Sequence, residues 1–160
     1  MKKIKYLGLI ATIVFAFTSC DLINDAKEAV DDYKDDQEAK YEESADGLKI
    51  TVSYKQAGIG IYHTAEFEDV RGDTLCTSLM SKTTYPLELT AKEVYEAAIK
   101  DMSAEEKANI KLDGKNITVN HPESKGEKKA GIKLGLMAIY EGYKKGGQIV
   151  SNIDIPTGNE

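Results

Sequence analysis

Residues 47–55 read Gly-Leu-Lys-Ile-Thr-Val-Ser-Tyr-Lys, and this stretch decides the fold class. Apolar and polar side chains alternate along it, which is the two-residue period of a strand with one buried face. The apolar positions are Leu48, Ile50, Val52 and Tyr54. Antiparallel sheets commonly bury one face and leave the other in water, whereas parallel strands are apolar throughout. The stretch therefore predicts an antiparallel sheet.

Further strand-like runs follow this stretch, and two turn signals separate them. Residues 59–68 form a second alternating run, Gly72-Asp73 is a turn signal, and residues 75–84 are β-prone. Asp113-Gly114 lies between two short apolar runs, which is the strongest short-range signal for a hairpin. A meander of three strands followed by a separate hairpin is therefore expected, and residues 149–155 read as a final strand.

Helix signals follow the meander. Thr90 with Glu93, and Ser103 with Glu106, have the spacing of capping boxes. Residues 125–145 fit two interpretations, because their apolar side chains recur at helical spacing and partly alternate as well; the helix is preferred. Together these patterns predict an α+β fold with an antiparallel sheet of about five or six strands and two or three helices packed on one face.

Acidic and basic side chains are unevenly distributed along the chain. Residues 21–46 contain eleven acidic side chains against three lysines, whereas residues 47–160 are almost neutral. We interpret 20–46 as an acidic helical or disordered spacer and 47–160 as one domain. A near-neutral domain lacks the basic footprint of a nucleic-acid-binding protein. The absence of Trp also argues against an aromatic platform for stacking sugars or bases.

The amino terminus has the pattern of an export signal. Three lysines precede the uncharged, mostly apolar residues 6–19, a run shorter than the roughly 20 residues needed to span a bilayer. The run ends in Phe17-Thr18-Ser19-Cys20, which resembles the lipobox of bacterial lipoproteins. Phe17 replaces the more usual Leu, and this loosened form is similar to lipoboxes of the Bacteroidota. The alternative is an ordinary signal peptide that contains a cysteine.

The lipobox resemblance implies a location. In that family residues equivalent to 1–19 are removed, and the cysteine, here Cys20, carries fatty chains such as palmitate. Each buried methylene contributes about 0.8 kcal/mol, so two or three chains anchor a protein stably. We therefore expect a lipid-anchored protein of the bacterial cell envelope, on the periplasmic or the outer-surface side of a membrane.

Few residues are candidates for chemistry. His63 shares its predicted strand face with Ile61 and Phe67, which favours a buried, hydrogen-bonded histidine over a catalyst. Cys76 lies in a β-prone run and is expected to be buried. If His63 and Cys76 met in one cleft they would suit a thiol enzyme. His121 lies in a predicted loop and has no recognisable partner.

Other candidate sites are weaker. Glu66 and Glu68 share a strand face at a separation compatible with acid–base work, although exposed strands often carry such pairs. No metal-binding pattern is present. Asp73-Thr74-Leu75 resembles the O-glycosylation pattern of the Bacteroidota, which makes Thr74 a possible acceptor. Arg71-Gly72-Asp73 resembles an integrin-binding tripeptide but also suits a tight turn.

These observations favour a non-catalytic binding or accessory module held on a membrane by its lipid. The expected partner is an unknown envelope protein or glycan, with no nucleic acid and no cofactor. An inhibitor or immunity lipoprotein that blocks a hydrolase or toxin is the first alternative. A small hydrolase or thiol enzyme that uses His63 and Cys76 is the second.

Overall fold

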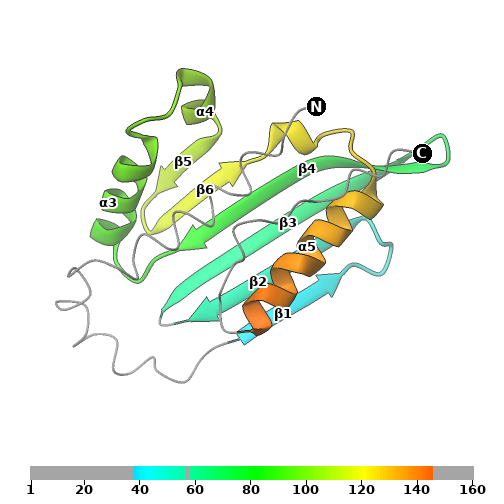
Figure 1. Ribbon diagram of the computed structural model, residues 1–160, viewed down its shortest axis with the longest axis horizontal. Coiled ribbons are helices and arrows are strands. Elements are labelled where there is room, and N and C mark those ends of the chain that lie inside the picture. Colours follow the sequence, from blue (N-terminus) through cyan, green and yellow to red (C-terminus); the bar gives the residue numbers. More distant parts are fainter. Residues whose placement is uncertain (1–37, 57, 146–160) are drawn as a thin grey trace.

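Six strands form one antiparallel sheet in the order β1-β2-β3-β4-β6-β5 (Figure 1). The computed structural model describes residues 38–56 and 58–145. The predicted α+β class is confirmed. The strands are β1 (Glu38–Glu43), β2 (Lys49–Gln56), β3 (Ile59–Val70), β4 (Asp73–Thr84), β5 (Ile110–Asp113) and β6 (Asn116–Asn120).

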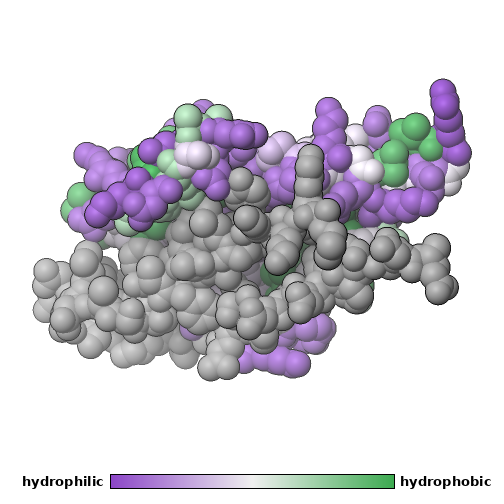
Figure 2. Space-filling model, turned by 45° about the horizontal axis from the view of Figure 1, so that its top comes forward, coloured by the Kyte–Doolittle hydropathy of each residue, from purple (hydrophilic) through white to green (hydrophobic). Residues whose placement is uncertain are grey.

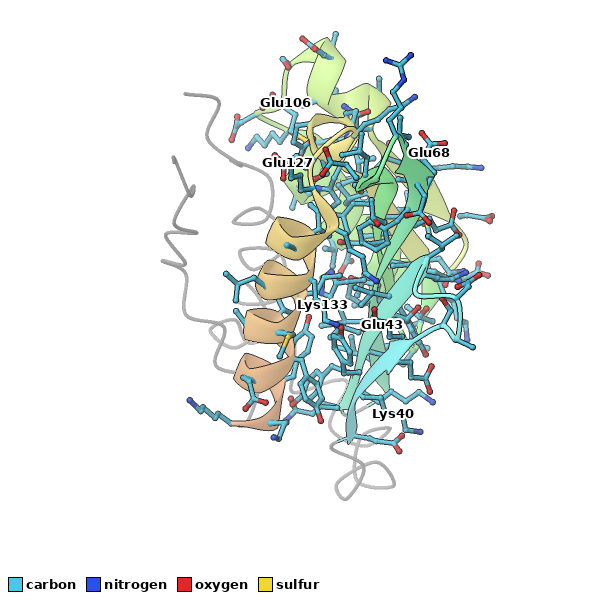
Figure 3. All side chains as sticks on the ribbon, turned by 90° about the vertical axis from the view of Figure 1, so that its right-hand side faces the viewer. Lys40, Glu43, Glu68, Glu106, Glu127 and Lys133 are labelled. Carbon is cyan, nitrogen blue, oxygen red and sulfur yellow. The ribbon has the colours of Figure 1, made fainter. Side chains whose placement is uncertain are left out.

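The helices pack on one face of this sheet. Helix α5 (Lys129–Lys144) contacts β1 to β4, and α3 (Glu88–Ile99) contacts β5 and β6. The short helix α4 (Ala104–Ala108) precedes β5, and a 3₁₀ turn, η2 (Pro122–Ser124), follows β6. Seen edge-on, α5 lies on one side of the sheet, and Lys40 and Glu68 point away from it (Figure 3). In the part of the chain that the structure describes, the sheet therefore has a helix-covered face and a face with no helix over it, which we call the open face.

Strand register extends this two-faced design across the whole sheet. One row of paired residues faces the helices and is mostly buried: Tyr41, Val52, His63, Ser81, Val119 and Ile110. The neighbouring row faces the other side and is polar: Lys40, Ser53, Tyr62, Lys82, Thr118 and Lys111. We call the second set the open-face row. Such alternation is what a sheet with one wet face requires.

Two apolar clusters lie beneath the helices. The larger joins α5 to β2, β3 and β4 and includes Ile50, Val52, Phe67 and Leu136. The smaller joins α3 to the β5–β6 hairpin, and Ile59 packs against both clusters. Because the two clusters meet at Ile59, one continuous core supports the sheet from β1 to β5.

Helix α5 resolves the ambiguity at residues 125–145. Its buried side chains are Ile132, Leu136, Ile139 and Tyr143, which lie three or four residues apart, as a helix facing a sheet requires. Gly135 and Leu136 are adjacent in sequence and both buried. A strand with one wet face would expose one of them.

Several boundaries differ from the expectations. Glu38–Glu43, predicted as the end of the spacer, forms the edge strand β1, because Ala39 and Tyr41 pack against the larger cluster. The Ser103–Glu106 capping box is confirmed, whereas α3 begins at Glu88, so Thr90 lies inside that helix. The hairpin predicted at Asp113-Gly114 is present. The predicted final strand and the signal segment lie outside the described residues.

Candidate functional site

A chain of five hydrogen-bonded side chains runs beneath the helices from α5 to η2. Tyr143 Oη lies 2.7 Å from His63 Nε2, and His63 Nδ1 lies 2.8 Å from Ser81 Oγ. On the other side, Ser81 Oγ lies 3.1 Å from His121 Nε2, and His121 Nδ1 lies 3.3 Å from Glu123 Oε1. We call this set the polar chain. It links α5, β3, β4 and the segment after β6.

The polar chain has only one proton arrangement when both histidines are neutral. An ionised Glu123 carboxylate only accepts, so His121 donates from Nδ1 and accepts at Nε2. Ser81 must then donate to His121 and accept from His63 Nδ1. His63 Nε2 is left as an acceptor, and the Tyr143 hydroxyl donates to it. One carboxylate therefore fixes the tautomers of both rings and the directions of both hydroxyl groups.

Burial keeps the two imidazole rings neutral. His63 is 3% exposed and His121 is 2% exposed. Loss of hydration, with a smaller contribution from His121, lowers the pKa of His63 to about 4. Burial also lowers the pKa of His121, although Glu123 opposes that change. The neutral arrangement is therefore the stable one near pH 7.

The polar chain contains the order Ser81–His121–Glu123, which is the connectivity of a serine hydrolase triad. Its nucleophile is closed off, however, because Ser81 is 4% exposed and lies in the middle of β4. The Ser81 oxygen also accepts from His63, so one of its two lone pairs is already engaged. The geometry is therefore that of a structural lock between α5 and the sheet.

The prediction of a buried, hydrogen-bonded His63 is confirmed, whereas the other members of the polar chain were not predicted from the sequence. His63 is buried and hydrogen-bonded, as its neighbours Ile61 and Phe67 indicated. His121, expected to have no partner, has two. No sequence pattern links Ser81 to His121, because the contact depends on how β6 pairs with β4.

Cys76 does not join His63. In the β3–β4 register His63 pairs with Ser81, whereas Cys76 pairs with Phe67, farther along the strand. Cys76 is 2% exposed, and its Sγ lies 3.4 Å from the carbonyl oxygen of Ser78. Burial and the nearby Glu127 raise the pKa of this thiol. Cys76 therefore packs as a small apolar residue rather than acting as a nucleophile.

Glu66 lies on the open face, away from the polar chain. It forms an ion pair with Lys49 at 3.4 Å and accepts from the Ser78 hydroxyl. Its neighbour Glu68 is exposed. Within 38–56 and 58–145, no group of three or more His, Cys, Asp or Glu side chains could hold a metal ion. This carboxylate pair is thus a solvated feature of a strand.

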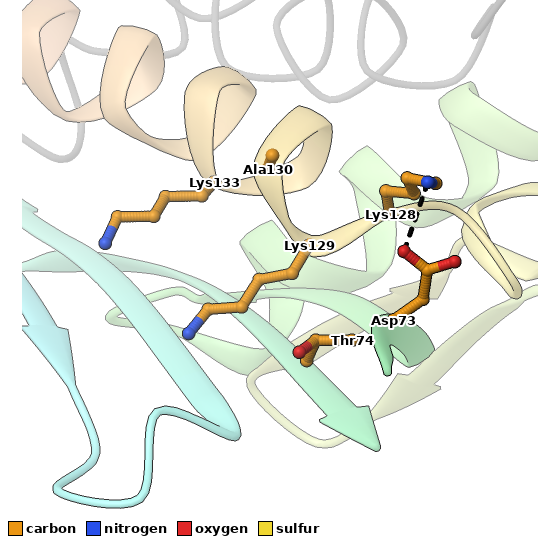
Figure 4. A pocket seen from close by; sticks show the side chains of 6 residues that line it. All are labelled: Asp73, Thr74, Lys128, Lys129, Ala130 and Lys133. Atoms are coloured by element: carbon orange, nitrogen blue, oxygen red, sulfur yellow. Dashed lines mark hydrogen bonds and ion pairs between the residues drawn. The ribbon is translucent and has the colours of Figure 1, made fainter. Parts of the chain in front are cut away.

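Thr74 lies at the start of β4, beside a surface hollow of about 360 Å³ (Figure 4). Its hydroxyl donates to Asp69 at 2.7 Å. The hollow is lined by three lysines, but their charges are compensated: Lys128 pairs with Asp73 at 3.1 Å, and the other two pair with Glu43. O-glycosylation at Thr74 stays a prediction.

Glu43 fixes the amino-terminal end of α5 to the sheet. Its two oxygens lie 2.7 Å from Lys129 Nζ and 2.6 Å from Lys133 Nζ, and Lys133 points toward Glu43 in Figure 3. Lys129 also donates to the carbonyl oxygen of Gly47. The hydrogen bonds from the two lysines lower the pKa of Glu43 to about 2. The lysine-rich start of α5 is therefore bound to the end of β1.

Glu43→Gln is expected to lower the free energy of unfolding by about 1 kcal/mol, since one change weakens two partly exposed ion pairs. Glu42→Gln is the matched control, because Glu42 is the next residue on β1, is exposed and has no ion pair with the described residues. Urea denaturation at low salt measures both variants, and salt should reduce the difference. Equal effects of the two substitutions would contradict this role of Glu43.

Comparisons with known proteins identify no matching family model, no similar curated protein and no similar solved structure.

Proposed function

We propose that the protein is a lipid-anchored, non-catalytic binding module of the bacterial envelope, which presents the open face of its sheet to a partner. The proposal for the anchor rests on the sequence at 1–20, where basic, apolar and small residues lead to Cys20 in the order of a lipobox. Within the described residues, no helix is long and apolar enough to cross a membrane. A lipid on Cys20 would supply the attachment.

The contrast between the two sheet faces carries the proposal for binding. On the helix face, the chemically capable groups are His63, Ser81, His121 and Cys76, and all four are buried. On the other face, half-buried side chains cross several strands, and no helix of the described residues lies over them. Nothing in residues 38–56 and 58–145 would have to move for a partner to reach the open face.

The rest of the described surface carries few exposed apolar side chains. In the view of Figure 2, hydrophilic residues cover most of the described surface and hydrophobic ones form small patches. Among the described residues, the large exposed apolar side chains lie in three separate places: Val70 at the β3–β4 turn, Leu87 and Leu89 at the start of α3, and Leu134 and Met137 on α5. Scattered apolar residues of this kind are normal for a soluble surface.

The β3–β4 hairpin favours an inhibitor as the second candidate function. Its two-residue turn places Arg71 at φ 52° and Gly72 at φ 93°, and the hairpin extends beyond the rest of the sheet (Figure 1). Val70 and Arg71 at the tip are exposed. A projecting tip of this shape suits insertion into the cleft of a hydrolase. Loss of an inhibited complex after deletion of the tip would distinguish this role.

Cys20→Ser is expected to move the protein from the membrane fraction to the soluble fraction of its native host. Removal of the thiol removes the site of acylation, and with it the apolar surface that holds the protein on a bilayer. Cys76→Ser is the matched control and should stay with the membrane. Immunoblotting of the two fractions gives the result, and a membrane-bound Cys20→Ser protein would contradict the anchor.

A further inference from the structure

The centre of the open-face row is an aromatic ring that lies along its strand. Tyr62 pairs with Ser53 on one side and Lys82 on the other. A Cβ atom placed on Gly60 would lie 3.0 Å from Tyr62 Cε2 and 3.2 Å from its hydroxyl oxygen. The ring therefore leans back over Gly60 instead of standing upright, and it can do so because residue 60 has no side chain.

Hydrogen-bonding groups surround this ring. On one side of Tyr62 along the strand, Gly60 pairs with Thr84, whose hydroxyl donates to Asn116 at 2.8 Å and can still accept. On the other side, Thr64 pairs with Thr51. Neighbouring strands are about 4.8 Å apart and alternate residues about 7 Å apart, so these hydroxyls lie within one ligand length of the ring. The Tyr62 hydroxyl itself makes no hydrogen bond with the residues of 38–56 and 58–145.

The cations beside the ring differ from those at the sheet edge. Lys40 is bound to Glu38 at 2.7 Å and Lys49 to Glu66 at 3.4 Å. Lys82 and Lys111, by contrast, form no ion pair within the described residues, and Thr118 is the residue between them in the open-face row. Two uncompensated ammonium groups therefore lie on one side of Tyr62, in a row that contains no acid.

We propose that the open-face row binds an acidic polysaccharide, with one sugar ring stacked on Tyr62 and the carboxylate groups of the chain at Lys82 and Lys111. An aromatic ring presents an apolar face to the C–H groups of a pyranose. Ser and Thr hydroxyls can donate to and accept from the hydroxyl groups of the sugar. Small molecules favour concave pockets, whereas a flat face suits an extended polymer. This inference names the ligand class of the proposed binding module and rests on that function.

The test uses the purified full chain and polygalacturonate as the probe, with affinity measured by retardation in native gels. Methyl-esterified polygalacturonate has the same sugars without the charge, and polyglutamate has the charge without the sugars. We expect binding to polygalacturonate, weaker binding to the ester, and little to polyglutamate. Tyr62→Ala should weaken binding about tenfold, which corresponds to the loss of one stacked ring.

Two further variants separate the position of the ring from its presence. Gly60→Ala keeps Tyr62 but displaces the flexible end of its ring, so it should weaken binding severalfold without unfolding the protein. Lys82→Gln should weaken binding about threefold at low salt. Lys92→Gln, on the exposed surface of α3, is the control and should bind normally. Circular dichroism confirms that each variant is folded.

Three outcomes would overturn the proposal: no retardation by polygalacturonate, equal retardation by polyglutamate, or unchanged binding by folded Tyr62→Ala. None of them concerns the lipid, because the Cys20→Ser fractionation is measured without any glycan. A failed glycan assay with a normal membrane fraction would therefore reject the ligand and leave the anchor in place. A native protein that is found in the soluble fraction but binds polygalacturonate would reject the anchor and leave the ligand in place.

Discussion

Ser81→Ala is expected to lower the free energy of unfolding by about 2–6 kcal/mol, although it removes only one oxygen atom. Ser81 is the one group that both accepts from His63 and donates to His121. Its loss leaves two buried ring nitrogens without partners, and each unsatisfied buried group costs about 1–3 kcal/mol. A domain of this size is stable by only about 5–15 kcal/mol, so a large part of its stability depends on this hydroxyl.

Thermal and urea denaturation of Ser81→Ala measure this effect. Ser78→Ala is the control, because Ser78 lies on the same strand, is exposed, and its hydroxyl hydrogen-bonds only to Glu66, at 3.4 Å, among the described residues. Its effect should stay within about 0.5 kcal/mol. If Ser81→Ala were as stable as Ser78→Ala, the polar chain would not be the lock between α5 and the sheet.

The second large effect is a loss of stability in weak acid. The unfolded chain binds a proton on His63 near its ordinary pKa of 6.5, whereas the folded protein does so only at about 4. Between these values the unfolded state holds more protons, so stability rises with pH. The contribution is complete above pH 6.5 and is lost as pH falls through 4. We expect a loss of about 2 kcal/mol between pH 7 and pH 5.

Urea denaturation at a series of pH values, with NMR titration of the His63 ring, tests this expectation. Acid titration of Glu43 does not interfere, because its stabilising effect is lost only below pH 4.5, as its pKa falls to about 2 on folding. His63→Gln should remove most of the slope, and His121 should account for the remainder. A His63 ring that titrates near 6.5 in the folded protein would contradict the account.

The strands were predictable where one face is apolar. Alternation along 48–54 and 59–67 identified β2 and β3, because every second side chain there enters the core. Strand β1 was not predictable in this way: it is a charged edge strand, and its only apolar side chains, Ala39 and Tyr41, pack against the larger cluster. Its pairing is decided by tertiary contacts that no local pattern encodes.

The residues of the candidate site also differ in how far the local sequence predicts their surroundings. Burial of His63 and Cys76 follows from their neighbours in sequence, so local reasoning was sufficient. The polar chain depends on pairing between β4 and β6 and on the end of α5, which bring together residues far apart in the chain. The sequence does not single out Tyr62, because only the structure shows that its ring lies along the strand over Gly60.

The helix face and the open face thus have different roles in this account. Tyr143, stacked on Tyr54 with ring centroids 4.7 Å apart, closes the helix face over the polar chain. No helix of the described residues covers the open face, which contains Lys82 and Lys111, two lysines that form no ion pair with those residues. The buried titratable groups stabilise the fold, and the exposed groups are left for binding.

Site-directed photo-crosslinking in living cells of the native host tests this division most directly. A benzophenone amino acid would replace Thr64, on the open face between Thr51 and Met80, or Leu134, which is 54% exposed on α5. We expect a crosslinked product from position 64 that Tyr62→Ala removes, and none from position 134. Products from position 134 with none from position 64 would contradict it.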